Sequence, residues 1–254
     1  MDIDFGKTAY DYGRYRAGFP DALFTRLRTF GVGIEGQRIL DLGTGTGTLA
    51  RGFARRGCAV TGLDRSPALI AEAQRLDQEA GVTVRYVTAA AEATGFPDAC
   101  FEVVTAGQCW HWFQRDRAAR EAHRVLASNG TLVIAHFDWL AMPGNVVEAT
   151  EQLIERHNPA WTFGGGPGMY PPWLHDVAVA GFRNTETFSF DLDVPYSHDA
   201  WRGRIRASAG VAASLPPDAV AHFDDNLRQL LTNDFPKEPL QVPHRVFAVI
   251  SHAA

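Results

Sequence analysis

The sequence predicts an α/β fold in which a parallel sheet is covered by helices on both faces. Short apolar runs alternate with segments of helical spacing between residues 36 and 138, and capping and turn residues stand at the segment ends. The chain has 254 residues, of which 46% are hydrophobic and 21% charged, an ordinary globular composition. Folding at this length buries roughly 70–75% of the surface of the unfolded chain, so no disulfide or structural metal is required.

The elements of the first half can be placed one by one. The helix Pro67–Glu79 has the clearest ends, because Ser66 is a natural N-cap, Pro67 suits the first helical position and Gly81 follows the last turn. Right-handed crossovers would bring the carboxyl ends of the parallel strands to one edge, where such sheets bind ligands. We expect strands at Arg38–Leu42, Ala59–Leu63, Val82–Val87, Glu102–Ala106 and Thr131–Phe137, and helices at Thr48–Arg56, Pro67–Glu79 and Arg115–Ala127.

The regular alternation ends near residue 140. Prolines, three consecutive glycines from Gly164 to Gly166, and Trp161, which we expect to be exposed, indicate an irregular insertion. We predict one domain over residues 1–254, with an N-terminal helical cap at 1–35, a cofactor-binding core at 36–138 and a helical lid built from 140–180 and 195–240. The later elements expected are helices at Val146–His157, Pro172–Ala180, Ala200–Ala213 and Pro217–Thr232, and strands at Thr185–Leu192 and Arg245–Ser251.

A glycine-rich turn, Gly43-Thr44-Gly45-Thr46-Gly47, follows the first strand and opens the first helix. Glycine permits backbone angles that a Cβ forbids and lets a ligand approach the main chain, and a helix N-terminus offers unpaired N–H groups. A plain tight turn is the alternative. Dinucleotide sites prefer G-x-G-x-x-G, whose third glycine would stand where this chain has Thr48. Two cofactor classes therefore remain open at this point.

Asp64 ends the second strand, about 20 residues beyond the turn, which is the usual distance for an acid that binds ribose hydroxyls. A carboxylate can accept hydrogen bonds from both hydroxyls. The alternative is an N-cap acid for the next helix, but Ser66 already suits that role. We interpret Asp64 as a ribose ligand.

Five segments, in order, resemble those of class I S-adenosylmethionine-dependent methyltransferases. Together they cover roughly residues 38–137, and Ser128-Asn129-Gly130 stands where relatives usually have Pro-Gly-Gly. The N-terminal segment Tyr15–Pro20 also resembles the Tyr-Arg-Pro-x-Tyr-Pro element of trans-aconitate methyltransferases. The five segments are Ile39–Gly47, Val60–Ser66, Ala90–Asp98, Phe101–Val104 with Gly107–Phe113, and His123–Leu126 with Asn129–Ile134.

The resemblance implies a Rossmann-like seven-stranded sheet, mostly parallel with its last strand antiparallel, and S-adenosyl-L-methionine as the cofactor. It also implies residue roles. The turn residues Gly43, Thr44, Gly45 and Gly47 would lie beneath the methionine part of the cofactor.

The resemblance implies roles beyond the turn as well. Arg16 could bind the cofactor carboxylate bidentately, or could be a surface arginine. The implied assignments are Asp41 to the amino group, Asp64 to the ribose, Arg65, Ala91 and Glu92 to the adenine, Gln108 to the methionine end and substrate, and Tyr15 with Arg16 to the carboxylate.

Two histidines are candidates for a general base. Methyl transfer from a sulfonium is an in-line displacement, so the protein mainly positions the reactants, and a base is needed only when the acceptor must lose a proton. His111 follows the fourth strand, and its type of side chain titrates near neutral pH. His136 ends the most apolar strand and is the second candidate. Packing between Trp110 and Trp112 is the alternative for His111, and a core position is the alternative for His136.

Aromatic and basic groups in the chain also admit two interpretations. A pocket for a flat or cationic acceptor is one function for aromatics near strand ends, and ordinary core packing is the other. An arginine run can be a solvated helix face or can contact an anion. The residues concerned are Trp110, Trp112, Trp139 and Trp161, and Arg202, Arg204 and Arg206.

We predict methylation of a small molecule, with O-methylation of a hydroxyl or carboxylate favoured. A non-catalytic cofactor-binding or scaffolding protein is the alternative, and a nicotinamide oxidoreductase is disfavoured by Thr48. The formal charge of -5 argues against nucleic-acid binding, and no apolar run approaches the roughly 20 residues needed to span a bilayer. Three irregularly spaced cysteines fit reduced thiols and no metal site, and the start Met1-Asp2-Ile3-Asp4 shows no secretory signal, so we expect a cytoplasmic protein.

Overall fold

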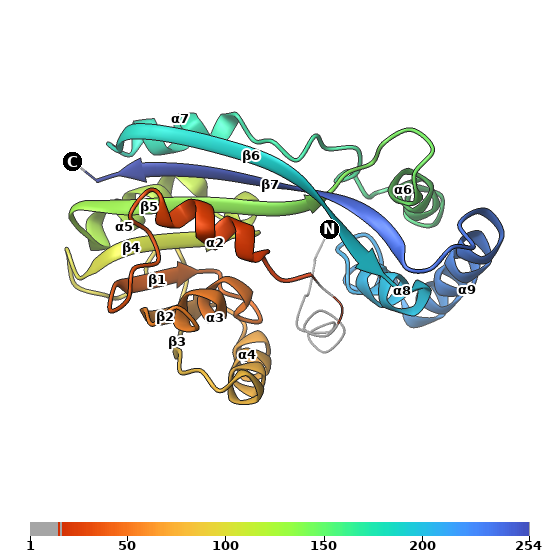
Figure 1. The fold of residues 1–254 in the computed structure, drawn as a ribbon, viewed down its shortest axis with the longest axis horizontal. Coiled ribbons are helices and arrows are strands. Elements are labelled where there is room, and N and C mark those ends of the chain that lie inside the picture. Colours follow the sequence, from red (N-terminus) through yellow and green to blue (C-terminus); the bar gives the residue numbers. More distant parts are fainter. Residues whose placement is uncertain (1–14, 16, 254) are drawn as a thin grey trace. The chain divides into compact units, whose positions relative to one another are not determined.

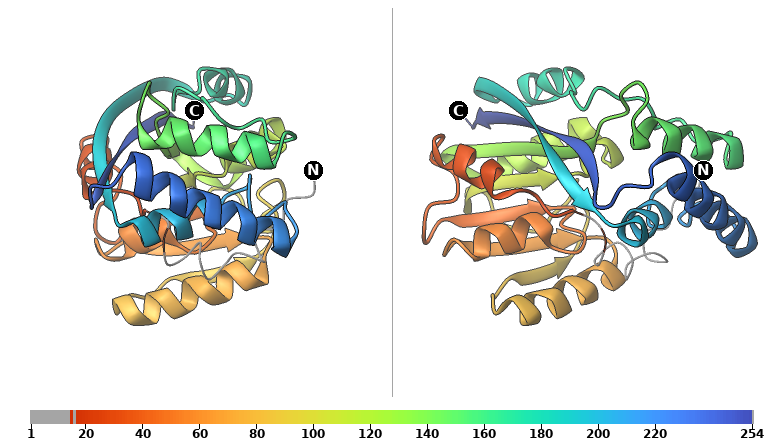
Figure 2. Two further views of the ribbon diagram at one scale, coloured as in Figure 1. Left: turned by 90° about the vertical axis from the view of Figure 1, so that its right-hand side faces the viewer. Right: turned by 45° about the vertical axis from the view of Figure 1, so that its right-hand side comes forward.

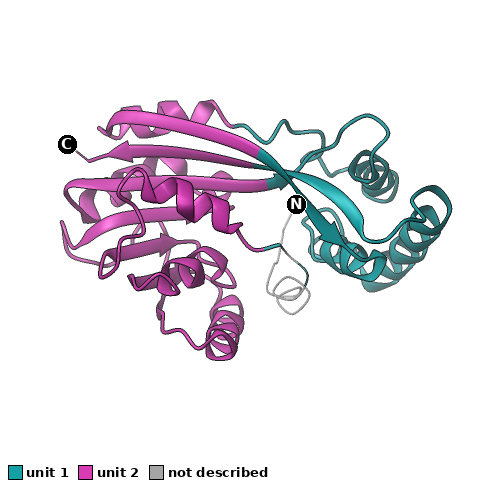
Figure 3. Ribbon diagram, in the orientation of Figure 1, with its two compact units in different colours: residues 1–17, 138–169, 191–245 teal, residues 18–137, 170–190, 246–254 magenta. Residues whose placement is uncertain are grey.

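The computed structural model describes residue 15 and residues 17–253 (Figure 1). It contains two compact units (Figure 3): unit 1 comprises Met1–Ala17, Asp138–Met169 and Asp191–Arg245, and unit 2 comprises Gly18–Phe137, Tyr170–Phe190 and Val246–Ala254. The predicted cofactor core therefore lies in unit 2, apart from its last residue. The predicted lid segment 140–180 is divided between the units at residue 170, and its role as a lid stays a prediction.

Seven strands form one sheet with the order β3-β2-β1-β4-β5-β7-β6. The pairs β1–β2, β1–β4, β2–β3 and β4–β5 are parallel. The last strand, β7, runs opposite to its neighbours β5 and β6 (Figure 1). The mostly parallel sheet with an antiparallel last strand is thus confirmed. The strands are β1 Arg38–Leu42, β2 Ala59–Asp64, β3 Arg85–Thr88, β4 Phe101–Gly107, β5 Leu126–Trp139, β6 Arg183–Tyr196 and β7 Leu240–His252.

The helices agree with the sequence pattern except at some ends. Ser66 accepts a hydrogen bond from the Leu69 N–H, and Gly81 ends the same helix with a φ of 64°, as the capping residues predicted. Helix α8 ends at Arg206, short of the predicted Ala213. The helices are α2 Asp21–Arg28, α3 Thr48–Ala54, α4 Pro67–Ala80, α5 Arg115–Val125, α6 Val146–His157, α7 Pro172–Val179, α8 His198–Arg206 and α9 Pro217–Asp234, with a 3₁₀ turn η2 at Trp110–Trp112.

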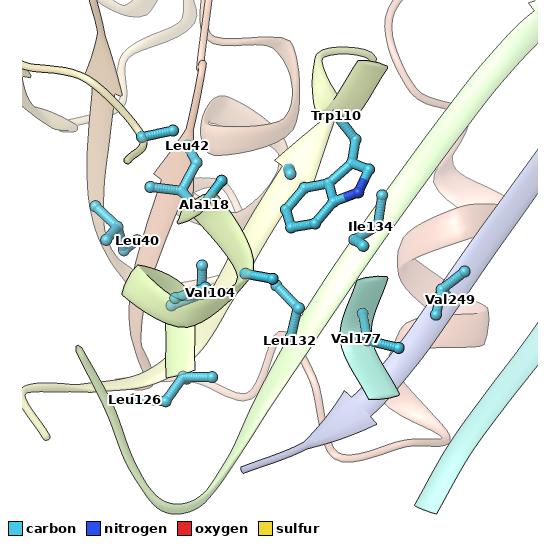
Figure 4. Close-up of a cluster of buried hydrophobic side chains, with 14 of the residues drawn as sticks. Leu40, Leu42, Val104, Trp110, Ala118, Leu126, Leu132, Ile134, Val177 and Val249 are labelled. Atoms are coloured by element: carbon cyan, nitrogen blue, oxygen red, sulfur yellow. The ribbon is translucent and has the colours of Figure 1, made fainter. Parts of the chain in front are cut away.

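In unit 2, helices cover both faces of the sheet. Side chains alternate along a strand, so every second residue of β1, β4 and β5 faces α5 and α7. Figure 4 shows this cluster, in which Leu40, Val104 and Ile134 lie with Trp110 and Val177. Helices α2, α3 and α4 form the other layer.

Unit 1 has an apolar core of its own. Helices α6 and α8 pack against α9 (Figure 2), and the contact buries Leu153, Ile205 and Leu227. Trp161 belongs to this core and is only 7% exposed, so the expectation that it is exposed was wrong. Its local sequence is rich in glycine and proline, but the indole packs against Gly164 and Gly210, which leave room for it.

Replacement of Gly52 by alanine tests the packing of α2 on α3. Alanine favours a helix by about 1 kcal/mol over glycine, but a Cβ here would lie 2.0 Å from the Phe24 ring. That ring is held edge-on by Phe53 and covered by the Arg56 guanidinium, so it has little room to move. We expect Gly52→Ala to lower the free energy of unfolding by roughly 1–3 kcal/mol in urea titrations. In a Phe24→Leu background the same change should lower the free energy of unfolding by less. Equal losses of unfolding free energy in both backgrounds would contradict the packing of Phe24 against Gly52.

Candidate active site

The register of the parallel strands brings several of the predicted site residues to one edge of unit 2. Leu42 pairs with Leu63 of β2 and with Ala106 of β4. One residue further along, Gly43 therefore lies level with Asp64 and Gly107, and Gly107 pairs with Ala135 of β5. Thr44 and Gln108 begin the loops after β1 and β4, whereas β5 continues through His136 to Trp139. Residues from four strands thus meet at the carboxyl edge.

The glycine turn has the left-handed conformations that the sequence suggested. Gly43, Gly45 and Gly47 have φ values of 58°, 55° and 76°. A Cβ on Gly43 would lie 2.9 Å from the Phe113 ring, whereas a Cβ on Gly45 would meet nothing within 4 Å. The turn is therefore closely packed at Gly43 and open at Gly45, where a ligand can approach the main chain.

Asp41 lies buried behind the turn, with 1% of its surface exposed. Its carboxylate accepts hydrogen bonds from the Thr44 and Thr105 hydroxyls, both at 2.7 Å. Burial raises the pKa of Asp41 from 3.8 to about 6, because desolvation of the ionised form outweighs the two threonine hydrogen bonds. Asp41 can therefore change its charge near neutral pH at a position adjoining the turn.

Asp64 is bound to the turn by its own carboxylate. One oxygen accepts the Gly45 N–H at 2.8 Å and the other accepts the Ser66 N–H at 2.9 Å. Both the sugar-binding interpretation and a local capping role are compatible with these bonds, since each carboxylate oxygen retains a further acceptor position. Ser66 itself caps α4, as the sequence indicated.

The remaining residues predicted to bind cofactor have varied surroundings. Ala91 is buried and Arg65 is exposed. Glu92 accepts the Gln114 N–H at 2.9 Å, just before helix α5. Gln108 has a φ of 63° and donates its side-chain N–H to the Phe137 carbonyl, which fixes the loop after β4.

The two N-terminal residues of the predicted set cannot both be placed. Tyr15 belongs to unit 1, where its ring packs against Gly203 of α8; a Cβ on Gly203 would lie 2.3 Å from that ring. Arg16 lies outside the described residues. The predicted role of both toward the cofactor carboxylate stays a prediction.

The two candidate bases lie side by side. The rings of His111, in η2, and His136, in β5, are 5.2 Å apart. His111 is exposed and His136 is buried. Tyr170 and Trp173 stack with each other at 4.0 Å, and each ring lies 4.7 Å from that of His136. The exposed His111 ring thus contacts the buried His136 ring, which in turn packs against the stacked rings of Tyr170 and Trp173.

The tryptophans differ from one another. Trp110 is fully buried and its indole N–H donates to Asp176 at 3.1 Å, so core packing explains it. Trp112, beside His111, is 41% exposed. In unit 1, Trp161 is a core residue and Trp139 donates to Glu151 at 2.7 Å.

The three arginines of α8 also differ from one another. Arg202 and Arg206 both form ion pairs with Asp224 of α9. Arg204 lies over the Trp139 ring at 4.5 Å, and burial lowers its pKa. At least two of the three therefore have internal partners.

Sequence reasoning missed Thr105, Tyr170 and Trp173. Thr105 pairs directly with Asp41 in the sheet, which explains the bond between them, but this pairing becomes visible only once the strand order is known. Tyr170 and Trp173 are 34 and 37 residues beyond His136 in sequence, in a segment without a recognisable motif.

The turn fits S-adenosyl-L-methionine on its own geometry. Gly45 is open to a ligand, and the Thr46 hydroxyl is buried without a hydrogen-bond partner among the described residues. Asp64 keeps an acceptor position on each carboxylate oxygen, which sugar hydroxyls can use. Asp41 is buried and its oxygens accept the Thr44 and Thr105 hydroxyls, so its predicted bond to the cofactor amino group stays a prediction. The open turn beside the Asp64 carboxylate suits a nucleoside.

Comparisons with known proteins identify the family of this chain. A model of the methyltransferase domain matches residues 40–134. A malonyl-[acyl-carrier protein] O-methyltransferase of Geobacter sulfurreducens is 34% identical over 228 residues, which cover 83% of this chain and 81% of that protein. A demethylmenaquinone methyltransferase of Thermus thermophilus is 41% identical over 104 residues, which cover 40% of this chain and 47% of that protein. The chain thus spans about half the length of the Thermus relative.

A solved structure adds evidence for the fold. The Haemonchus contortus phosphoethanolamine N-methyltransferase 2, in complex with S-adenosylhomocysteine, superposes with a TM-score of 0.57 at 20% identity, over 99% of this chain and 60% of that one. The chain belongs to the methyltransferase family, and it is an S-adenosylmethionine-dependent enzyme of that family. Within the part of the chain that the structure describes, no helix has the length and apolarity needed to cross a membrane.

The raised pKa of Asp41 predicts a specific pH dependence of stability. Between about pH 4 and pH 6 the folded protein holds a proton that the unfolded chain has released, so stability falls as the pH rises through this range. The rise from 3.8 to about 6 corresponds to roughly 3 kcal/mol. The difference in unfolding free energy between the parent and Asp41→Asn, measured by urea titration at each pH, should change over this range and level off above about pH 7. A flat difference would show that Asp41 has an ordinary pKa.

Proposed function

We propose that this methyltransferase transfers the methyl group to an oxygen atom of a small molecule, either a hydroxyl or a carboxylate. The pair of histidine rings 5.2 Å apart at the edge that carries the glycine turn supports this most directly. A hydroxyl must lose its proton on methylation, and a base within reach of the acceptor is then needed.

The cofactor supplies a methyl group already activated on a sulfonium. The residues of this chain would hold the cofactor and acceptor in line and keep the acceptor oxygen free of competing water. In this arrangement Asp64 holds the ribose and Asp41 the amino group, while Gly43, Thr44, Gly45 and Gly47 form the surface beneath the methionine part. Arg65, Ala91 and Glu92 border the adenine, and Gln108 borders the methionine end.

His111 is the base in this proposal, because its ring is exposed at the start of the loop after β4. His136 is buried beside it, against the stacked rings of Tyr170 and Trp173, so its role is to support the His111 ring. With a carboxylate acceptor, which is already ionised at neutral pH, neither histidine has to remove a proton.

The name of one of the two relatives supports an oxygen acceptor. One is called an O-methyltransferase and acts, by that name, on a malonyl group carried by a protein. The relative from Thermus is named for demethylmenaquinone. We extend from them only the chemical class, a small organic acceptor. The cytoplasmic location that we propose rests on the three cysteines, which form no disulfide.

Asp64→Ala tests the ribose assignment. Loss of the carboxylate removes the ribose contacts and the bond to the Gly45 N–H, so S-adenosylhomocysteine should bind at least about tenfold more weakly in calorimetry. Asp116→Ala is the matched control, because that aspartate is exposed and forms a surface ion pair with Arg120. Affinity within twofold of the parent in Asp64→Ala would remove Asp64 from the cofactor site.

His111→Ala separates the two acceptor types. On hydroxyl acceptors the turnover number should fall by about 10²- to 10⁴-fold, with unchanged affinity for S-adenosylhomocysteine, whereas carboxylate acceptors should show little change. The screen pairs each carboxylic acid with a phenol or alcohol of similar size and identifies the methylated atom by mass spectrometry. His252→Ala, at the far end of β7, is the control. Methyl groups found only on nitrogen or carbon would overturn the proposed oxygen acceptor.

A further inference from the structure

A buried polar cluster lies beneath the glycine turn and takes no part in the roles described above. It consists of Arg51 of α3, Asp77 of α4 and Tyr86 of β3, which we call the buttress cluster. Arg51 and Asp77 are buried, with relative exposures of 9% and 4%. Their ion pair, from Nε to a carboxylate oxygen, measures 2.7 Å. The Tyr86 hydroxyl donates to the other carboxylate oxygen at 2.7 Å.

The cluster is connected directly to the turn through one guanidinium nitrogen. Nη2 of Arg51 donates to the carbonyl of Thr46 at 2.8 Å and to that of Ala73 in α4 at 3.1 Å. The Thr46 carbonyl belongs to the peptide that joins Thr46 to Gly47. The Gly47 N–H of the same peptide donates to the Thr44 carbonyl at 2.9 Å. The orientation of this peptide is therefore fixed from both of its ends.

The absence of side chains at two glycines makes room for the cluster. A Cβ on Gly47 would lie 2.6 Å from the Tyr86 hydroxyl and 3.1 Å from Arg51, and Gly47 has a φ of 76°. A Cβ on Gly62 would lie 2.7 Å from the Tyr86 ring. Glycine is thus required at position 47 for two reasons. The backbone angle is left-handed, and the Tyr86 and Arg51 side chains occupy the space that a Cβ would need.

We propose that Arg51, Asp77 and Tyr86 are positioning residues that hold the glycine turn in its cofactor-binding conformation, and so set the affinity for the cofactor without touching it. An ion pair that served only to join α3 to α4 would need no bond to a carbonyl of the turn. Arginine suits this role because its planar group binds a carboxylate and two carbonyls at once, which an ammonium cannot do with the same geometry. Burial and the Asp77 carboxylate raise the pKa of Tyr86, so its hydroxyl keeps the proton that it donates.

Two variants test this role. Arg51→Lys keeps the charge but loses the planar group, and Tyr86→Phe removes a single oxygen and is expected to fold. S-adenosylhomocysteine should bind about tenfold more weakly to Arg51→Lys and about threefold more weakly to Tyr86→Phe in calorimetry. In an Asp77→Asn background, Tyr86→Phe should weaken binding of S-adenosylhomocysteine only slightly further, because the charged acceptor of the Tyr86 hydroxyl has already been removed.

A control separates positioning from general stability. Val249→Ala removes buried volume on β7, in the cluster that faces α5 and α7, and should lower the melting temperature without affecting the turn. Hydrogen exchange of the Gly47 N–H in the cofactor-free protein should speed up in the two buttress variants and not in Val249→Ala.

The outcomes are distinct. Weaker binding with faster local exchange, absent in the control at a similar melting temperature, supports the positioning role. Affinity within twofold of the parent in Tyr86→Phe and in folded Arg51→Lys overturns it, as does an equal loss in Val249→Ala. If Arg51→Lys does not fold, Tyr86→Phe alone decides. The acceptor plays no part in these measurements, so failure here leaves the proposed oxygen acceptor untouched.

Discussion

The parallel register of β1 against β2 and β4 is the constraint on which the rest of the site depends. Leu42, Leu63 and Ala106 lie level with one another, so the chain leaves each strand at the same height. The register alone therefore brings the glycine turn, Asp64 and the loop after β4 to one edge of the sheet. A slip of one residue in any of these strands would exchange the side chains on its two faces and move its loop away from the others.

The turn itself is held from two directions. At the end of the strands, the Asp64 carboxylate binds the Gly45 N–H and the Thr44 hydroxyl binds Asp41. From beneath, the Arg51 guanidinium binds the Thr46 carbonyl. A left-handed glycine is flexible by itself, because it has no Cβ to restrict it. Hydrogen bonds from both directions convert this freedom into one defined conformation, which is the condition for binding a ligand without first ordering the loop.

Much of this arrangement could be predicted from the sequence, because its signals are local. Ser66, Pro67 and Gly81 marked both ends of α4. The spacing between the turn and Asp64 predicted that the two lie together, and the Asp64 carboxylate does accept the Gly45 N–H. The errors arose where long-range packing overrides local composition. Trp161 stands among glycines and prolines, which suggested exposure, yet the lack of side chains on Gly164 and Gly210 is what lets its ring be buried.

The sequence by itself determined the fold class, since capping residues and strand periodicity act over a few residues. The resemblance of its motifs to those of methyltransferases indicated the cofactor. Only the tertiary structure decided which distant side chains share a neighbourhood. It placed His111 beside His136 and joined Arg51 to Asp77 and Tyr86, because these pairs depend on strand order and on how helices pack across it. No spacing in the chain encodes such contacts, which follow from the register of the sheet and the volumes packed against it.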